Sequence, residues 1–498
     1  MSTTITPARP RLRVPRLPDR RTLRVELLAG LVVALALIPE AISFSVIAGV
    51  DPEYGLYASF TMAVTIAIVG GRPAMISAAT GAMALVVVDL VRDHGVEYLL
   101  MAGILAGAIQ IALGAVGVAG LMRFVPQSVM TGFVNALAIL IFLSQLDHLT
   151  GGGAAGWAIA VVGLATILLL PRLTTAVPPP LVAILLLTGV VVAFGVDVPT
   201  VGDEGELPDA LPFVALPDVP FSLDTLTTVL PYSATLAVVG LLESLMTARL
   251  VDDITDTPSD KGREARGQGV ANVVTGLFGG MPGCAMIGQT MINVRASGAR
   301  TRLSTFTAGV VLLVLVVGLG DVVAVIPMTA LVAVMVFVSY ATFDWHSIAP
   351  ATLRLMPRGE TLVMALTVAA TVATSNLAIG VAVGVVVSMA LFARRVAHVV
   401  GVERTVAPDG ASVRYAVRGA LFFASNEDLT DAFHHPDDPE RVVVDLTDAH
   451  VWDASAVAAL DAVVHRYAER GRAVEIVGLD PRSRELHGRL TGVAAGAR

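Results

Sequence analysis

Two stretches of the chain share an unusual pattern: GGRPAMISAATGAM at 70–83 and GGMPGCAMIGQTM at 279–291. Each reads Gly-Gly-x-Pro, continues through small residues with polar atoms, and then enters a long apolar run. Glycine and proline also occur at simple kinks and close contacts of membrane helices, so a single break would favour that reading. Two matched breaks, one in each half of a chain, instead indicate a transport site near the membrane midplane.

The composition is that of a membrane protein with a soluble tail. The 498 residues are 55% hydrophobic and 15% charged, with a mean hydropathy of +0.77, whereas soluble proteins average about a quarter charged residues. Apolar runs of membrane-spanning length fill residues 24–398, and residues 399–498 have an ordinary soluble composition. The one cysteine, Cys284, excludes an intramolecular disulfide.

The apolar segments number about fourteen, seven on each side of an acidic, proline-rich loop at 196–227. The arm at 1–23 is rich in arginine, which places the N-terminus in the cytoplasm by the positive-inside rule. Because this rule already explains the arginines, they do not indicate that the arm binds nucleic acid. An even number of crossings returns the tail to the cytoplasm. The sequence therefore predicts a multi-pass protein of the plasma (cytoplasmic) membrane, in contact with lipid, with both termini inside.

The tail alternates strand and helix patterns, which predicts a small α/β domain. VRYAVRGALFFA at 413–424 is typical of a strand pair or hairpin. RVVVDLTDA at 441–449 and AVEIVGLD at 473–480 are typical of buried strands. The segment between them has helical apolar spacing and ends at Gly471.

Each break is expected to open a half helix. Ser77 and Thr80 follow the first proline, and Gly288, Gln289 and Thr290 follow the second. Helix N-termini carry partial positive charge and free N–H groups, so two such ends facing each other across a gap suit an anion.

Two acids stand inside otherwise apolar segments, where ionisable groups are costly and usually functional. Glu40 follows Pro39, which is expected to break or loosen its helix, and Glu243 precedes Thr247 by one turn. An acid beside an anion site cannot attract the anion, but it can accept a proton or bind a cation. The alternative interpretations are that Glu40 lies close to the membrane boundary and that Glu243 pairs with Arg249 or with another helix.

Longer motifs resemble the sulfate permease family, whose animal members are the solute carrier 26 anion transporters. IPEAISFSVIAGVDPEYGLYASF at 38–60 is similar to the first-helix signature of that family, and NVRASGARTRLS at 293–304 is similar to the stretch after its tenth helix. The tail resembles a STAS domain, the module shared by sulfate transporters and anti-sigma-factor antagonists. The resemblance spans the chain from about residue 20.

The resemblance implies a polytopic α-helical membrane protein with fourteen segments in two inverted seven-segment repeats, similar to uracil permeases, and then the STAS domain. Segments 1–4 and 8–11 would form a mobile core and segments 5–7 and 12–14 a gate. Such proteins are commonly homodimers. The positions that the resemblance assigns to substrate are Glu40, Phe44, Ala79, Thr80, Gly81, Glu243, Thr247, Met286, Ile287, Gly288, Gln289 and Thr290.

Three departures from the family pattern bear on the coupling ion. Glu40 replaces the usual glutamine, and Gln289 or Thr290 stands where many relatives carry a basic residue. Glu243 and Thr247 stand where sodium-coupled bicarbonate relatives have an Asp and a Thr that help to bind sodium. In the tail, Asp453-Ala454-Ser455 replaces the phosphorylatable Asp-Ser-Ser, which leaves only Ser455 for a phosphorylation switch.

We expect a secondary active transporter of a dicarboxylate such as fumarate, of bicarbonate or of sulfate, working by alternating access in symport with a proton. The rivals are a sodium-coupled bicarbonate symporter and an electroneutral exchanger or leaky channel, followed by a nucleobase permease and a sensor that signals through its tail. The sequence shows no metal cluster, catalytic triad or P-loop. We therefore expect no enzymatic activity, no cofactor beyond the coupling ion (H⁺ or Na⁺), and at most a cytoplasmic partner for the STAS domain.

Overall fold

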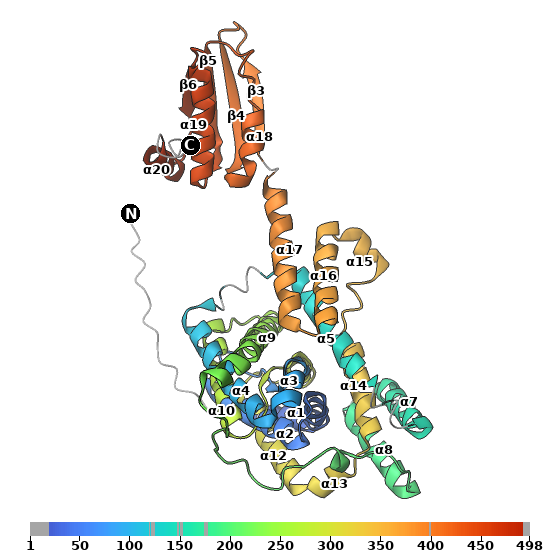
Figure 1. The fold of residues 1–498 in the computed structure, drawn as a ribbon. Helices are drawn as coiled ribbons and strands as arrows, with labels where there is room; N and C mark the ends of the chain where they lie inside the picture. Colours follow the sequence, from blue (N-terminus) through green and yellow to red (C-terminus); the bar gives the residue numbers. More distant parts are fainter. Residues whose placement is uncertain are drawn as a thin grey trace. The chain divides into compact units, whose positions relative to one another are not determined.

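The computed structural model describes residues 19–118, 120, 125–146, 149, 153–173, 178–397 and 400–491. The chain divides into two compact units, one up to Gly384 and one from Val385 onwards. The first is helical and the second carries a four-stranded sheet (Figure 1). Most of the predicted arm at 1–23 lies outside the described residues, and the first helix begins at Arg20.

One group of helices encloses the two sequence breaks. Within it, α1 packs on α2, α3 and α12, while α10 packs on α2, α4 and α9. Its elements are α1 (Arg20–Ala48), α2 (Pro52–Val69), β1 (Ser77–Ala79), α3 (Gly81–His94), α4 (Val96–Ala115), α9 (Leu223–Thr255), α10 (Lys261–Leu277), β2 (Gly283–Ala285), α11 (Ile287–Met291), the π-helix η4 (Ile292–Ala296) and α12 (Arg302–Gly318).

A second group forms the rest of the helical unit. Here α5 packs on α14 and α16, and α7 packs on α8 and α14. Its helices are α5 (Gln127–Ser144), α7 (Gly153–Leu169), α8 (Pro179–Phe194), α14 (Met328–Thr342), α15 (Pro350–Leu355) and α16 (Arg358–Thr374). The short helix α13 (Gly320–Ala324) follows α12 and contacts it, and α17 (Leu377–Ala397) contains the boundary between the two units. The division into core and gate segments, and the roles of the two groups in transport, stay predictions.

The ends of the long helices follow local chemistry. The Asp19 side chain accepts a hydrogen bond from Thr22 N and caps α1, and Gly49 ends that helix with a left-handed φ of 79°. Between these ends α1 runs without interruption through Pro39, where the sequence predicts a break or a loosened turn. Membrane helices tolerate proline where neighbouring helices and Ser or Thr hydroxyls support the backbone, and the Ser43 hydroxyl donates to the Pro39 carbonyl at 2.8 Å.

Six of the described helices are long and apolar enough to cross a membrane. They are Arg20–Ala48, Val96–Ala115, Gln127–Ser144, Gly153–Arg172, Leu223–Thr255 and Leu377–Val396. Pro179–Phe194, Arg302–Gly318 and Met328–Thr342 are shorter apolar helices. The count of fourteen crossings therefore stays a prediction.

The second unit is built around a sheet of order β3-β4-β5-β6 (Figure 1). β4 pairs with β3 antiparallel and with β5 parallel, and β5 pairs with β6 parallel. The segment predicted as a strand pair is a single strand, and its hairpin partner precedes it. The elements are β3 (Gly401–Val406), β4 (Ser412–Leu421), α18 (Asn426–Asp431), β5 (Arg441–Val451), α19 (Ala454–Ala468), β6 (Ala473–Val477) and α20 (Pro481–Leu490).

Asp438 is a buried acid of this unit. The Asp438 carboxylate accepts from the hydroxyls of Tyr415 and Tyr467, each at 2.5 Å, and from Arg404. Burial raises the pKa of Asp438, but these hydrogen bonds outweigh it and hold the pKa below its usual range. At the start of α19, Asp453 accepts from Ala456 N and Phe423 N, so it acts as a helix cap, and Ser455 beside it is exposed.

Candidate functional site

The two breaks meet and cross inside the first group of helices. After α2 the chain passes through a turn at 71–74 into β1, and after α10 it passes through a turn at 278–279 into β2. The two short strands pair antiparallel, with Ser77 opposite Ala285, Ala78 opposite Cys284, and Ala79 opposite Gly283. The prediction that both segments interrupt their helices is therefore confirmed by the backbone, and the two half helices α3 and α11 start close to one crossing.

Gly283 permits the close approach of the two strands. A β-carbon added there would lie 2.3 Å from the Ala78 carbonyl oxygen, too close for any side chain. The Asn272 side chain holds the same residue in place, since its Oδ1 accepts from Gly283 N at 2.9 Å and its Nδ2 donates to Gly283 O at 3.0 Å. Gly283, the glycine after the proline of the break, thus sets how closely the two strands can pack.

A Gly283→Ala substitution is expected to destabilise the helical unit, because the strand must move away from Ala78 or strain its backbone. Overpacking of this kind costs about 1–3 kcal/mol. Thermal unfolding of the purified protein in detergent measures the loss. Gly288→Ala is the matched control, because its added β-carbon meets nothing within 4 Å. Equal unfolding temperatures for the two variants would contradict this account of the crossing.

Charged side chains of the second half satisfy the backbone of the first break. Glu264 on α10 is fully buried, and its Oε2 accepts from Gly71 N at 2.7 Å and from Arg72 N at 2.8 Å. Arg302 on α12 donates to the carbonyl oxygens of Ala67 and Gly70. Backbone groups inside a membrane protein need such partners, and here they are ionic.

Neutral groups satisfy the second break. Met281 N donates to the Tyr54 carbonyl at 3.0 Å, and Ala285 N donates to the Ser244 hydroxyl at 3.1 Å. Met286 N donates to the Ile76 carbonyl at 2.9 Å. The two breaks share a sequence pattern but differ in the chemistry that holds them.

Each predicted acid contacts the second break. Glu40 is 9% exposed, and its Oε1 accepts from Gln289 Nε2 at 2.6 Å. Glu243 is 6% exposed, and its Oε2 accepts from the Cys284 thiol at 2.9 Å. Neither acid pairs with an arginine or lysine among the described residues, so the alternative of a Glu243–Arg249 pair finds no support.

A third contact links the two breaks through the cysteine. The Cys284 sulfur lies 3.2 Å from the Thr80 hydroxyl, and Thr80 is the N-cap of α3, accepting from Met83 N. Sequence reasoning missed Cys284 as a site residue; its place three residues before Ile287 in the second break is the signal that could have found it. Thr80, Cys284 and Glu243 therefore form one buried row from α3 to α9.

The remaining predicted site residues lie around this row. Phe44 is buried and packs over Gly81 at the start of α3, where an added β-carbon would lie 2.9 Å from its ring. Thr290 accepts from Ile76 N at 3.0 Å, so its hydroxyl ties α11 to the first break. Ala79 and Met286 are buried in or beside the strands, Ile287 is half-buried, and Gly288 is exposed.

Two features differ from the sequence expectation. The Thr247 hydroxyl donates to the Glu243 backbone carbonyl at 2.8 Å rather than to its carboxylate. A hydroxyl in a helix commonly makes this bond to the carbonyl four residues earlier. The half helix of the second break, α11, has only five residues and continues as the π-helix η4, whereas α3 has fourteen.

The sequence matches known families along both units. The sulfate permease family model matches residues 23–156 and 154–367, and the STAS domain model matches residues 404–495. The chain belongs to the sulfate permease family. YbaR of Bacillus subtilis (strain 168), whose name describes a sulfate transporter, is 54% identical over 464 residues, which cover 93% of this chain and 96% of YbaR. The bicarbonate transporter BicA of Picosynechococcus sp. is 29% identical over 385 residues, 70% of this chain and 67% of BicA.

Solved structures agree with this assignment. The transmembrane domain of a cyanobacterium bicarbonate transporter BicA superposes with a TM-score of 0.63 at 27% identity, covering 74% of this chain and 98% of that domain. SLC26A9 superposes with a TM-score of 0.80 and covers 95% of this chain and 87% of its own, but at 16% identity it shows the fold alone. The chain is therefore a multi-pass membrane anion transporter and not an enzyme, and the prediction of a helical membrane domain followed by a STAS domain is confirmed.

Proposed function

We propose that this transporter carries a small anion by alternating access in symport with a proton, and that the substrate lies at the crossing of the two breaks. The observation that carries the proposal is the pair of buried acids, Glu40 and Glu243, each bonded to a residue of the second break. An ionised acid repels an anion, and an acid without a cationic partner is costly in a membrane. Protonation removes both penalties at once, so anion and proton are expected to bind together.

The backbone supplies the attraction for the anion in this proposal. The first turn of α3 begins at Gly81, next to the Thr80 cap, and presents N–H groups to the crossing. Gln289, which stands where relatives often carry a basic residue, donates to Glu40 and adds no charge. Protonation of Glu40 would release that amide from its ionised acceptor and leave it available to an anion.

Sodium coupling is the second candidate. It is favoured by the places of Glu243 and Thr247 and by the likeness to BicA, whose name describes a bicarbonate transporter. The Thr247 hydroxyl donates its hydrogen to the Glu243 backbone carbonyl. Its oxygen lone pairs and the two oxygens of the Glu243 carboxylate are then the side-chain ligands that this pair can offer to sodium. The substrates that we propose are bicarbonate, sulfate and dicarboxylates such as fumarate.

We also propose where the transporter is located and how it is assembled. We infer a location in the plasma (cytoplasmic) membrane with both termini in the cytoplasm, a homodimer, a mobile core formed by the first group of helices, and a STAS domain that binds a cytoplasmic partner. What supports these points is the arginine-rich arm, the packing of the helices in two groups, and membership of the family.

The test is uptake into proteoliposomes that contain the purified full chain. Labelled fumarate, bicarbonate and sulfate are offered with an inward proton gradient, with an inward sodium gradient, and with neither. Accumulation of one anion above its equilibrium level under the proton gradient is expected. Accumulation only under the sodium gradient would replace the proton by sodium, and uptake of no anion under any gradient would refute the transport proposal for these substrates.

A further inference from the structure

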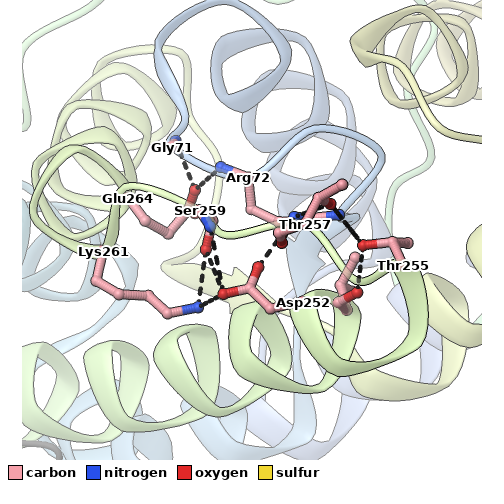
Figure 2. A network of polar contacts seen from close by, with 9 residues as sticks. Gly71, Arg72, Asp252, Thr255, Thr257, Ser259, Lys261 and Glu264 are labelled. Carbon is pink, nitrogen blue, oxygen red and sulfur yellow. Dashed lines mark hydrogen bonds and ion pairs between the residues drawn. The ribbon is translucent and has the colours of Figure 1, made fainter.

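A polar network joins the entry of the first break to the turn between α9 and α10 (Figure 2). Arg72 is its centre, and only 6% of that residue is exposed. Its Nη1 donates to Asp252 Oδ1 at 2.9 Å and to the Thr257 carbonyl at 2.8 Å, and its Nη2 donates to the Thr255 hydroxyl at 2.6 Å. The Thr257 hydroxyl accepts from both nitrogens at 3.0 Å.

The partners of Arg72 are themselves fixed. Asp252 accepts through its other oxygen from Lys261 Nζ at 2.5 Å and from the Ser259 hydroxyl at 3.0 Å. Glu264, one turn further along α10, holds the backbone N–H of Arg72 (Figure 2). The second half of the chain thus binds both the side chain and the backbone of this one residue, and the planar guanidinium contacts acceptors that a lysine ammonium cannot reach together.

Strained backbone flanks the network on both sides. Ala74 has φ 62° and Asp256 has φ 49°, and in the described chain only Ser375 shares such a left-handed conformation among residues other than glycine. Residues held in this region persist only where the surrounding structure determines them, and they cluster at functional sites. Ala74 lies two residues after Arg72, and Asp256 lies between two of its partners, Thr255 and Thr257.

From Ala74 onwards every residue that leads to the site is bonded to the second half. The Ala74 carbonyl accepts from Asn293 Nδ2 at 2.8 Å, and the Met75 carbonyl accepts from the Thr305 hydroxyl at 3.1 Å. Ile76 N donates to Thr290, and Ser77–Ala79 then form β1 against β2. We therefore expect a shift of the backbone at Arg72 to move this bonded segment and, with it, Thr80.

We propose that Arg72 is a positioning residue of the transport site: it fixes the entry of the first break against the α9–α10 turn and so sets where Thr80 and the start of α3 stand beside Cys284 and Glu243. Arg72 does not touch the anion. This inference rests on the proposed function only for its effect on transport, because the position of the strand is measurable without any substrate.

The first test measures that position through the thiol of Cys284, whose residue pairs with Ala78 across the crossing. The rate of maleimide labelling of the full chain in detergent is compared between wild type, Arg72→Lys and Thr257→Val, well below their unfolding temperatures. Both variants are expected to label at least tenfold faster. Thr257→Val removes the two hydrogen bonds from Arg72 and one with the Thr255 hydroxyl, but no charge, so it serves if Arg72→Lys fails to fold. Arg92→Ala is the matched control, because Arg92 is an exposed arginine on α3 that pairs only with Asp89 and Asp93 among the described residues.

The second test measures transport by the same variants in proteoliposomes. A displaced α3 start should weaken anion binding, so KM is expected to rise about tenfold with little change in the maximal rate per folded protein. In a Thr80→Ala background the Arg72→Lys effect on KM should shrink, because both changes act on the same point. Unchanged labelling and unchanged KM would overturn the inference, and a lower yield of folded protein with unchanged labelling would show a merely structural role. If wild type transports no anion, the labelling result still decides the inference and only the proposed function fails.

Discussion

A Glu243→Gln variant is expected to lose accumulation of its anion against a gradient while it still exchanges labelled for unlabelled anion. The glutamine side chain has nearly the same shape and can still accept from the Cys284 thiol, which now donates to Glu243 at 2.9 Å. What the variant lacks is the proton site. The site is then permanently in the neutral form, so the anion is expected to bind and move without a proton.

The size of the effect follows from the coupling. One proton per anion transmits about tenfold accumulation for each unit of pH gradient, since one unit corresponds to about 1.4 kcal/mol. The variant should reduce that ratio to about one, while the initial rate of counterflow exchange stays within about threefold of wild type. Glu360→Gln, on an exposed residue of α16, is the matched control. If the variant accumulates anion as wild type does, Glu243 is not the coupling acid, and Glu40 is then the residue to replace.

Modification of Cys284 is expected to abolish transport. Cys284 is the one cysteine of the chain and is completely buried at the crossing, where its sulfur contacts both Glu243 and Thr80. A methanethiosulfonate reagent transfers its thio group to the thiolate, forming a mixed disulfide and releasing sulfinate. The added group has no room between the two strands, so transport should fall at least tenfold, in line with the cost of overpacking a buried site.

The measurement pairs mass spectrometry of the intact protein with uptake. Transport should fall in proportion to the modified fraction and return after reduction by dithiothreitol, and saturating substrate should slow the modification. Cys284→Ser is the control, because it keeps a hydroxyl donor for Glu243 and cannot be modified. Complete modification with undiminished uptake would place the transport path away from the crossing.

The sequence predicts the elements of this site better than their contacts. The Gly-Gly-x-Pro pattern predicts each break, and Glu40 and Glu243 are recognisable as site candidates because charged residues are rare in apolar segments. The register of β1 on β2 depends on Gly283 meeting the Ala78 carbonyl, a contact across some two hundred residues that no local pattern encodes. Glu40 and Gln289 are both predicted site residues, yet their hydrogen bond follows only from the packing of α1 on α11.

Other differences have equally specific causes. β3 was not predicted because its residues are almost all exposed and show no alternation of buried and exposed positions. Pro39 was expected to break α1, but a helix packed against α2, α3 and α12 has little freedom to open. Cys284 is a small residue in a stretch of small residues, so the sequence pattern does not distinguish it from its neighbours. Its role as a hydrogen-bond donor follows only from the structure, in which Glu243 lies beside it.

The exchange of partners between the halves has a consequence for the order of events during synthesis. The N–H groups of Gly71 and Arg72 depend on Glu264, and Ile76 depends on Thr290. These partners are synthesised about 190 to 215 residues later, which at about 5–20 residues per second takes roughly 10–40 s. During that interval these backbone N–H groups lack the partners that they have in the folded protein. The first break therefore reaches its final hydrogen bonding only after α10 and α11 have been synthesised.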